Sequence, residues 1–489
     1  MLRPTYANAK PPPQPMPRDA HLSVSLPTLL GVAPLLGGAL EDRSTIRDNQ
    51  DPRIVDHALT CSHREVNPAV LQGFCVAPLD FLVTGTPRSQ RVGLIELNGS
   101  GMGGLTNLPL GVISAVLTTL SQVAPLLRER GPSVVLVSAS GGPPSSAPRQ
   151  NTLLHEKLFY VDALLAGLRA LGRDVSVTTL DRLRASSPTS SASGDITIVL
   201  GFSAELGEAV EVRSGEAWLH GRRVAGIVND RLCLDVWGRT GEDRPPPFVA
   251  INRSFVAGAD KSVAYDVLDR MALGPDSAFP SVRACEPHRR AGSRQELIRD
   301  LASTLETRGT PLLIKPRGTG QGDGIEFFLD GSATRSQIEA TVDRSLASVG
   351  FRYGSFERAF PYTICDFIDS STIPDPHHAC FGHKFELRIV VFRDGNALRA
   401  CPAIAKVASE VWDPQRPTRA MLINNITYSS RELQRPGHSF MLSLCNEGTL
   451  ASLGVSLDLL SETCRFATAY VEAALQSPAA CGASPAASA

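Results

Sequence analysis

The residues best suited to chemistry form a glycine-rich stretch that follows a lysine. In LLIKPRGTGQGDGIEFF, an apolar strand ends at Lys315, and alternating glycines precede the next strand. Such glycines let backbone N–H groups close around phosphate oxygens, and the lysine supplies a point charge at the base of the loop. The stretch is not a P-loop, because it lacks Gly-Lys-Ser/Thr and joins strand to strand. It predicts a phosphate-binding loop, with an ordinary glycine-rich hairpin as the alternative. The loop glycines expected to bind the nucleotide are Gly318, Gly320 and Gly322.

A second lysine and an acid on either side of this loop extend the nucleotide hypothesis. Lys261 opens a helix after a Gly-Ala-Asp turn, and Asp366 ends the apolar strand YTICDFID. A nucleotide held between two subdomains needs a second cation for its phosphates and an acid for its ribose. Taken alone, Lys261 is equally well explained as a solvated lysine in a first helical turn.

Two long consecutive strands carry charged side chains among otherwise apolar residues. Glu386 and Arg388 are two residues apart in FELRIVVF and therefore share one face of a strand. Arg399 and Lys406 follow on the next strand, NALRACPAIAK. Because burying unpaired charges is costly, these side chains favour an anion-binding cleft. The alternative is an edge sheet with one wet face.

An earlier strand ends with groups that suit a metal ion. Glu96 and Asn98, in VGLIELNGSGMGG, are two residues apart, and Asp80 lies on the preceding strand. Carboxylate and amide oxygens are hard ligands of the kind that Mg²⁺ prefers. The glycines of GSGMGG do not match a dinucleotide-binding motif, because no acid follows about 20 residues later at the end of a second strand. The sequence therefore predicts strand-end metal ligands followed by a glycine-rich turn. A separate His/Cys cluster, in PHHACFGHKFE, is better explained as a surface loop than as a zinc site.

The elements that must position these residues alternate along the chain. APLDFLVTG and RVGLIEL predict a hairpin, followed by a helix in LPLGVISAVLTTLSQVAPLLRER. Strands and helices alternate in residues 131–250, with EAWLHGRRVAGIVNDRLCL as a small hairpin and another strand that includes GIVNDRLCL, and predict a covered parallel sheet. The predicted divisions are an N-terminal extension (1–60, the first ~20 residues disordered), a metal-binding part (61–130), an α/β substrate domain (131–250), nucleotide-binding subdomains (251–412) and a C-terminal segment with a helix and a disordered tail (413–489).

Composition excludes several classes of protein. The 489 residues carry a net charge of -1, so no basic field points to nucleic acid or an anionic membrane. The apolar segment Leu22–Leu40 is broken by proline and glycine, so we expect no membrane anchor. Ten scattered cysteines without a CxxC pair indicate reduced thiols, and hence a cytoplasmic protein.

Together, these motifs resemble the ATP-grasp superfamily. The Glu-x-Asn pair comes first here rather than last, an order similar to that of the circularly permuted members, above all eukaryotic-type glutathione synthetase. IELNGSGMGGLT, GIVNDRLCL, GADKSV, KPRGTGQGDG and FELRIVV follow in that permuted order over roughly residues 75 to 410. The resemblance implies an α/β (α+β) fold, a circularly permuted ATP-grasp core with an α/β substrate-binding domain, and a homodimer.

The resemblance also implies roles for single residues. Glu96 and Asn98 match metal ligands for Mg²⁺, while Lys261 and Lys315 match lysines that bind ATP phosphates. The other matches are Glu386 at the nucleotide, Arg399 at the acyl phosphate and Ser100 at the substrate. Beyond these matches, we expect Arg388 as an alternative to Arg399 at the acyl phosphate, Lys406 at the nucleotide and Arg231 at the substrate.

Departures from the family limit what can be carried over. The family's loop glutamate, its third metal ligand, corresponds to Thr319, so Asp323 or Asp80 would have to replace it. A substrate arginine of the family corresponds to Pro78, and Arg231 is displaced from its motif. Since the peptide-binding parts differ, glutathione itself is not the expected product.

The sequence leaves three functions open. The first is an ATP-dependent carboxylate–amine ligase that acts on an amino acid or small peptide through an acyl phosphate and releases ADP. The second is a small-molecule kinase on the same scaffold. The third is a nucleotide-binding module without turnover, for which the absence of an acid at position 319 argues.

Overall fold

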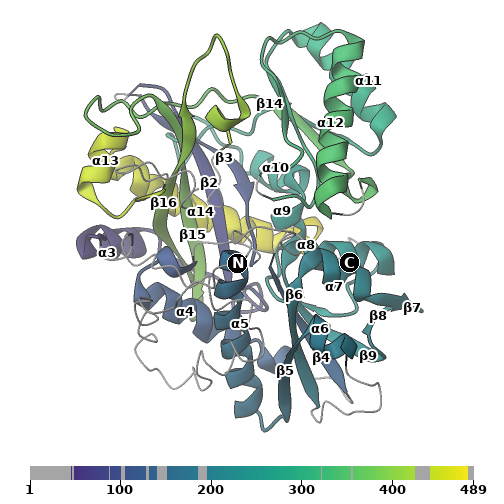
Figure 1. The fold of residues 1–489 in the computed structure, drawn as a ribbon. Helices are drawn as coiled ribbons and strands as arrows, with labels where there is room; N and C mark the ends of the chain where they lie inside the picture. Colours follow the sequence, from purple (N-terminus) through teal and green to yellow (C-terminus); the bar gives the residue numbers. More distant parts are fainter. Residues whose placement is uncertain are drawn as a thin grey trace, which may run out of the picture.

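The computed structural model describes residues 46, 49–86, 89–100, 105–127, 132–139, 151–185, 195–320, 322–353, 356–423 and 441–482. This part of the chain is a mixed α/β structure with sheets of six, seven and four strands (Figure 1). The predictions for the proline-rich start, the apolar segment 22–40, the turn 101–104 and the C-terminal tail lie outside the described residues. No helix among the described residues is long and apolar enough to cross a membrane.

The six-stranded sheet is antiparallel and joins segments from both ends of the chain. Its order is β1-β16-β15-β2-β3, and β17 pairs with β16. The predicted hairpin is confirmed, because β2 and β3 pair directly. Helices α3, α4 and α14 pack against this sheet. The strands are β1 (Arg64–Glu65), β2 (Val76–Thr84), β3 (Arg91–Leu97), β15 (His383–Asp394), β16 (Ala397–Val411) and β17 (Met441–Ser443), and the helices are α3 (Pro52–Cys61), α4 (Leu110–Ser121) and α14 (Leu457–Gln476).

The seven-stranded sheet is the predicted parallel sheet. Its order is β5-β6-β4-β9-β8-β7, with β10 beside β9. Strands β5, β6, β4, β9 and β10 are parallel, and β8 and β7 form an antiparallel edge. The elements are β4 (Ser133–Ala139), α5 (Asn151–Ala170), β5 (Val175–Thr179), α6 (Leu180–Ala185), β6 (Ile196–Phe202), α7 (Ser203–Ala209), β7 (Glu211–Arg213), β8 (Glu216–Leu219), β9 (Arg222–Val228), α8 (Asp230–Thr240) and β10 (Val249–Ala250).

One expected strand in this region is wrong. The sequence after Val228 continues as helix α8 and not as the strand predicted from GIVNDRLCL. Asn229 caps this helix, because its side chain accepts a hydrogen bond from the backbone N–H of Leu232. The cap ends strand β9 and turns Asp230 and Arg231 toward the other sheets.

The four-stranded sheet has a hydrophobic core of its own. Its order is β11-β14-β12-β13, and helices α11 and α12 pack against one face at the upper right of Figure 1. Helix α11 was not predicted, although Ser293 caps its start and Gly309, at φ 59°, ends it. The elements are β11 (His288–Ala291), α11 (Arg294–Arg308), β12 (Leu312–Lys315), β13 (Glu326–Phe328), α12 (Arg335–Tyr353) and β14 (Tyr362–Asp366).

Three short helices complete the described chain: α9 (Phe255–Ala259), α10 (Lys261–Asp269) and α13 (Glu447–Leu453). Helix α10 begins as predicted, because the Asp260 carboxylate caps it by accepting a hydrogen bond from the Ser262 N–H. The ten cysteines are all free thiols. Strand β15 pairs with β2, and β16 pairs with β15, so the segment 383–411 shares its sheet with the segment 76–97 rather than with β12.

Candidate functional site

A cavity of about 230 Å³ lies where the three sheets meet. The six-stranded sheet contributes β3, β15 and β16, and the four-stranded sheet contributes β12, β14 and the glycine-rich loop after Lys315. The N-terminal turn of α8 and helix α10 complete the wall. We call this cavity the central pocket. Residues from 82 to 423 along the chain therefore line one space.

The charged strands of the six-stranded sheet form one connected row. Lys406 pairs with Glu386 across β16 and β15, and Arg388 lies opposite Asp80 across β15 and β2. The Arg388 guanidinium donates two hydrogen bonds of 2.7 Å to the Asp80 carboxylate, and the Lys406 ammonium lies 3.0 Å from it. Asn98 extends the row to β3 by donating hydrogen bonds to Asp80 (2.9 Å) and Glu96 (3.1 Å).

Asp80 is held as a fully buried carboxylate within this row. Burial by itself raises its pKa, but the charges of Arg388 and Lys406 outweigh burial and hold the pKa well below its usual value. With two cations already neutralising it, Asp80 is a structural counter-ion and does not line the central pocket. The expectation that Asp80 is a metal ligand is therefore corrected.

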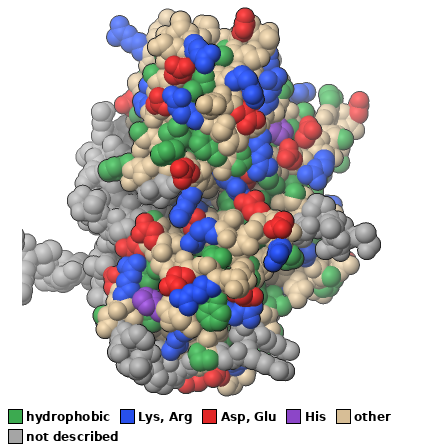
Figure 2. Space-filling view, turned by 90° about the vertical axis from the view of Figure 1, so that its right-hand side faces the viewer, with side chains coloured by type: hydrophobic (Ala, Val, Ile, Leu, Met, Phe, Trp, Pro, Cys, Tyr) green, Lys and Arg blue, Asp and Glu red, His purple; other side chains and the backbone are tan. Residues whose placement is uncertain are grey.

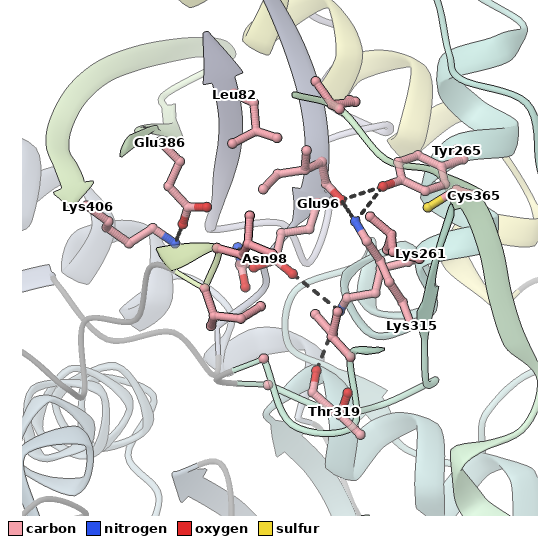
Figure 3. A pocket seen from close by; sticks show the side chains of 18 of the residues that line it. Leu82, Glu96, Asn98, Lys261, Tyr265, Lys315, Thr319, Cys365, Glu386 and Lys406 are labelled. Atoms are coloured by element: carbon pink, nitrogen blue, oxygen red, sulfur yellow. Dashed lines mark hydrogen bonds and ion pairs between the residues drawn. The ribbon is translucent and has the colours of Figure 1, made fainter. Parts of the chain in front are cut away.

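The two lysines expected at the phosphates converge on the end of β3. The Lys261 ammonium lies 3.4 Å from a Glu96 carboxylate oxygen and donates to the Thr319 carbonyl oxygen at 3.5 Å. The Lys315 ammonium donates to the Ile95 carbonyl oxygen at 3.1 Å. Figure 3 shows both lysines on one side of the pocket, with the Glu386–Lys406 pair on the opposite side. Residues distant in sequence thus lie around one small volume, as a single bound triphosphate would require.

Tyr265, which was not among the predicted site residues, positions Lys315. Its hydroxyl accepts a hydrogen bond of 2.7 Å from the Lys315 ammonium and donates one of 2.9 Å to the Ile95 carbonyl oxygen. Tyr265 lies four residues after Lys261 on α10, so a helical reading would have placed both on one face. Burial lowers the pKa of Lys315, although the negative charge of Glu96 opposes this effect. An anion in the pocket would favour the charged form of Lys315 and so oppose this effect.

The glycine-rich loop adopts the conformations that require glycine. Gly318, Gly322 and Gly324 have φ of 66°, 72° and 70°, which side chains with a Cβ rarely adopt. The Gly318 N–H donates to the Ala259 carbonyl oxygen at 2.8 Å, which joins the loop to the start of α10. Gly318, Gly320 and Gly322 all line the central pocket, as the nucleotide hypothesis requires.

One part of the central pocket is apolar. Its side chains come from β2, β3, β12, β13 and the segments after Asp366 and Met421. Phe327 and Phe367 meet edge to face, with ring centroids 6.1 Å apart. The apolar residues are Leu82, Ile95, Leu313, Ile325, Phe327, Phe367, Ile368, Leu422 and Ile423. An apolar slot beside a charged region matches an amphipathic ligand with a flat base and an anionic tail.

A metal ion would find two oxygen ligands in this pocket. Glu96 offers a carboxylate, and Asn98 offers its amide oxygen, because its amide nitrogen already donates to two carboxylates. Asp323, the other acid considered for this role, is buried and does not line the pocket. Nowhere in the described part of the chain do three His, Cys, Asp or Glu side chains group as a metal site. The donor set therefore fits a cation that takes its remaining ligands from phosphate and water.

Three expected site residues are placed differently from the prediction. Two of them, Arg399 and Ser100, do not line the pocket, and the third, Asp366, lines it but is paired with an arginine. Arg399 lies opposite Phe392 on β15, six positions from the Glu386–Lys406 pair, or about 20 Å along the strand, and it bonds Asp394 instead. Ser100 is buried, and its hydroxyl donates to Asp230. Asp366 lines the pocket but makes a two-point ion pair with Arg308.

Arg231 reaches the pocket from a helix rather than from the expected strand. Two other lining residues were not anticipated. Lys384 bonds Asp369 at 2.6 Å at one end of the pocket, and Cys365 lies beside Lys315. No simple sequence pattern marks either of them, since both are single residues in strands.

The fold and pocket define a mixed α/β protein with a composite site between sheets. No protein-family model matches this chain, and no curated protein sequence does. Solved structures do match, among them a glutathione synthetase-like effector from Globodera pallida in its apo form. That match covers 79% of this chain and 85% of the other, at 10% sequence identity and a TM-score of 0.30.

Proposed function

We propose that this protein is an ADP-forming ligase that joins a carboxylate to an amine at the expense of ATP. The observation that carries the proposal is the convergence of Lys261, Lys315 and the glycine-rich loop on Glu96, beside an apolar slot. This combination suits a nucleoside triphosphate, with the base in the slot and the phosphates between the two ammonium groups.

The chain's own residues act by holding charge and excluding water. Lys261 and Lys315 bind phosphate oxygens, and the backbone N–H groups of the loop close over them. Glu96 and Asn98 would hold Mg²⁺, which would supply positive charge to neutralise the phosphate oxygens. Arg388 lines the pocket but is committed to Asp80, so it acts as a fixed positive neighbour rather than as a mobile group.

The reaction proceeds through two displacements. A substrate carboxylate oxygen attacks the γ-phosphorus, the bond to the β–γ bridging oxygen breaks, and ADP leaves an acyl phosphate behind. The amine nitrogen then attacks the acyl carbon, phosphate departs with the bonding electrons, and the nitrogen loses a proton to form an amide. Closure of the glycine-rich loop over the phosphates would serve this sequence, because an acyl phosphate exposed to water would hydrolyse.

A second candidate is a nucleotide-binding protein without turnover. It is favoured by the charge balance of the site. Thr319 stands at the loop position where the family has a glutamate, and Asp80 is neutralised by Arg388 and Lys406, so Glu96 is the one lining acid close to both phosphate lysines. A single carboxylate would hold a catalytic metal less firmly than the sets that phosphoryl-transfer enzymes use.

Product analysis with ATP and Mg²⁺ separates the candidates. The protein is incubated with amino acids and dipeptides, ADP is measured, and mass spectrometry searches for new amides. The ligase predicts ADP that depends on an amine together with a condensed product. A kinase would release ADP and yield a phosphorylated hydroxyl without an amine. ATP binding without ADP would favour the second candidate, and absence of ATP binding would overturn all three.

Two variants tie the outcome to the site. Lys315→Met removes the buried ammonium, and Arg335→Gln changes an exposed arginine on α12 that bonds only its helical neighbour Glu339 among the contacts of the structure. We expect the first to lose most ATP affinity and the second to retain it. Equal affinities in both would mean that the central pocket is not the nucleotide site.

A further inference from the structure

A second cavity lies behind the glycine-rich loop. It has a volume of about 260 Å³ and separates helix α8, of the seven-stranded unit, from residues 357–360, of the four-stranded unit. Its inner wall is shared with the central pocket, because Arg231, Gly318 and Thr319 line both spaces. We call it the rear pocket.

Side chains of both charges line the rear pocket. Asp235 is one of its lining residues and lies 3.2 Å from Arg358 on the opposite wall and 3.3 Å from Arg239 on its own helix. Arg317, from the glycine-rich loop, bonds Glu242 at 2.8 Å and so makes a second ion pair across the cavity. On the face shown in Figure 2, basic and acidic side chains are interspersed between the upper and lower parts of the molecule.

These charges surround apolar side chains. Leu232 and Leu234 come from α8, and Val349 and Phe360 come from the opposite unit. The volume is below the range of about 300–1,000 Å³ typical of pockets for drug-sized ligands. The space therefore suits a small molecule with a short hydrocarbon part.

The charge pattern selects the class of ligand. A guanidinium has five N–H donors. Arg239 uses three of them, on the carbonyl oxygens of Asp235 and Val210 and on the Asp235 carboxylate. Arg358, which pairs with Asp235 through one nitrogen, keeps more donors for a ligand carboxylate. Asp235, Glu242 and Glu357 would repel a purely anionic ligand, and the surrounding arginines would repel a purely cationic one. A zwitterion satisfies both sets, with its carboxylate toward arginine and its ammonium toward an acid.

We propose that the rear pocket binds the amine substrate, an amino acid or short peptide in its zwitterionic form. The assignment as a substrate rests on the proposed ligase function, whereas binding of the zwitterion does not. The shared wall at Arg231, Gly318 and Thr319 places this ligand directly behind the loop that would cover the phosphates. The loop thereby links occupancy of the two pockets.

Thermal denaturation and calorimetry without ATP test this proposal. The probes are the standard amino acids and diglycine, each added alone to the full-length protein. We expect at least one probe to raise the melting temperature of the wild type, and Arg358→Gln and Arg239→Gln to weaken its binding about tenfold or more. Both arginines are partly exposed, at 44% and 30%, so we expect both variants to fold, and the unfolding transition without probe checks this.

Matched variants identify the site of any binding. Arg335→Gln, on the exposed surface of α12, should bind the probe as the wild type does. Lys315→Met should lose ATP affinity but keep the probe, which separates the two pockets. The proposal is overturned if no probe binds the wild type, or if Arg358→Gln and Arg239→Gln both bind it normally. Probe binding that depends on these arginines, without any ligase product, would refute the ligase while retaining the rear pocket.

Discussion

At the scale of single residues, the charge of Asp80 organises the row of strands behind the central pocket. It is 0% exposed and serves as counter-ion to Arg388 and Lys406. Removing one member of such a buried group leaves the others uncompensated in a medium of low dielectric constant. Asp80 therefore acts through the charges that it fixes rather than through contact with a ligand.

We predict that Asp80→Asn lowers the free energy of unfolding by about 3–5 kcal/mol. Because the folded-state pKa of Asp80 is lowered, its contribution is complete above the unfolded value of about 3.9. The stabilisation by Asp80 is lost as the pH falls below about 3.9 toward the folded-state pKa. The free energy of unfolding should therefore decrease less steeply with falling pH in the variant than in the wild type. Denaturant titrations at several pH values measure this.

The control for Asp80 is Asp343→Asn, an exposed carboxylate that bonds Arg294. Its substitution should change the free energy of unfolding by no more than about 0.5 kcal/mol. Comparable losses in both variants would show that Asp80 is not the buried counter-ion described above.

Lys315 gives a second prediction at this scale, on the pH dependence of ATP affinity. Burial lowers the pKa of its ammonium, so the group loses its charge at a lower pH than an exposed lysine does. As the pH is raised, ATP affinity should therefore begin to decline before the pH reaches about 10.4, the usual pKa of a lysine. Lys315→Arg stays charged and should remove this alkaline decline. A decline of the same shape in Lys315→Arg would assign the titration to another group.

At the scale of elements, the close approach of β3 to α8 decides how the central pocket is walled. Gly99 follows β3, and a Cβ built on it would lie 1.5 Å from an Asp230 carboxylate oxygen. Asp230 begins α8 and also accepts a hydrogen bond from Ser100. The strand end and the helix start can therefore meet only because residue 99 has no side chain.

We predict that Gly99→Ala displaces the first turn of α8 and lowers stability by about 1–3 kcal/mol, as overpacking does. ATP binding should weaken as well, since both elements line the central pocket. Gly111→Ala is the matched control. A Cβ there meets nothing within 4 Å, and alanine should stabilise helix α4 by up to about 1 kcal/mol. If the Gly99→Ala variant proved as stable as the Gly111→Ala variant, the close contact between the end of β3 and the start of α8 would be contradicted.

At the scale of the whole molecule, the described chain has two hydrophobic cores. One lies between the four-stranded sheet and helices α11 and α12 and includes Leu301. The other is larger, runs through the six- and seven-stranded sheets and includes Leu136. The larger core also includes Leu313 and Cys365 of the four-stranded sheet, whereas the rear pocket and its ion pairs lie between the four- and seven-stranded units.

We predict that residues 288–366 open independently of the other two sheets. Leu301→Ala, in the smaller core, should cost about 2–5 kcal/mol and accelerate amide hydrogen exchange within 288–366 only. Leu136→Ala should act on the larger core in the same way. Exchange measured by mass spectrometry distinguishes the two patterns, and a uniform increase across the chain in both variants would show a single cooperative unit.

Local patterns in the sequence were enough to predict some of this structure. The β2–β3 hairpin, the parallel sheet of residues 133–250 and the start of α10 at Lys261 all follow from short-range periodicity, turns and caps. The loop after Lys315 was also foreseen, because its glycines are required by positive φ at Gly318 and Gly322. These features depend on residues within one or two turns of each other.

Other features depend on partners that are far away along the chain. The carboxylate of Asp80 looked like a metal ligand until β15 and β16 brought Arg388 and Lys406 to it, more than 300 residues later. Arg399 shares a strand with Lys406, yet the register pairs it with Phe392, about 20 Å along the strand from the Glu386–Lys406 pair, and it does not line the pocket. The sequence by itself determined which residue types could bind phosphate and a metal ion. Only the tertiary structure decided which of them share a pocket, because strand pairing and the burial of each charge are set by contacts between distant segments.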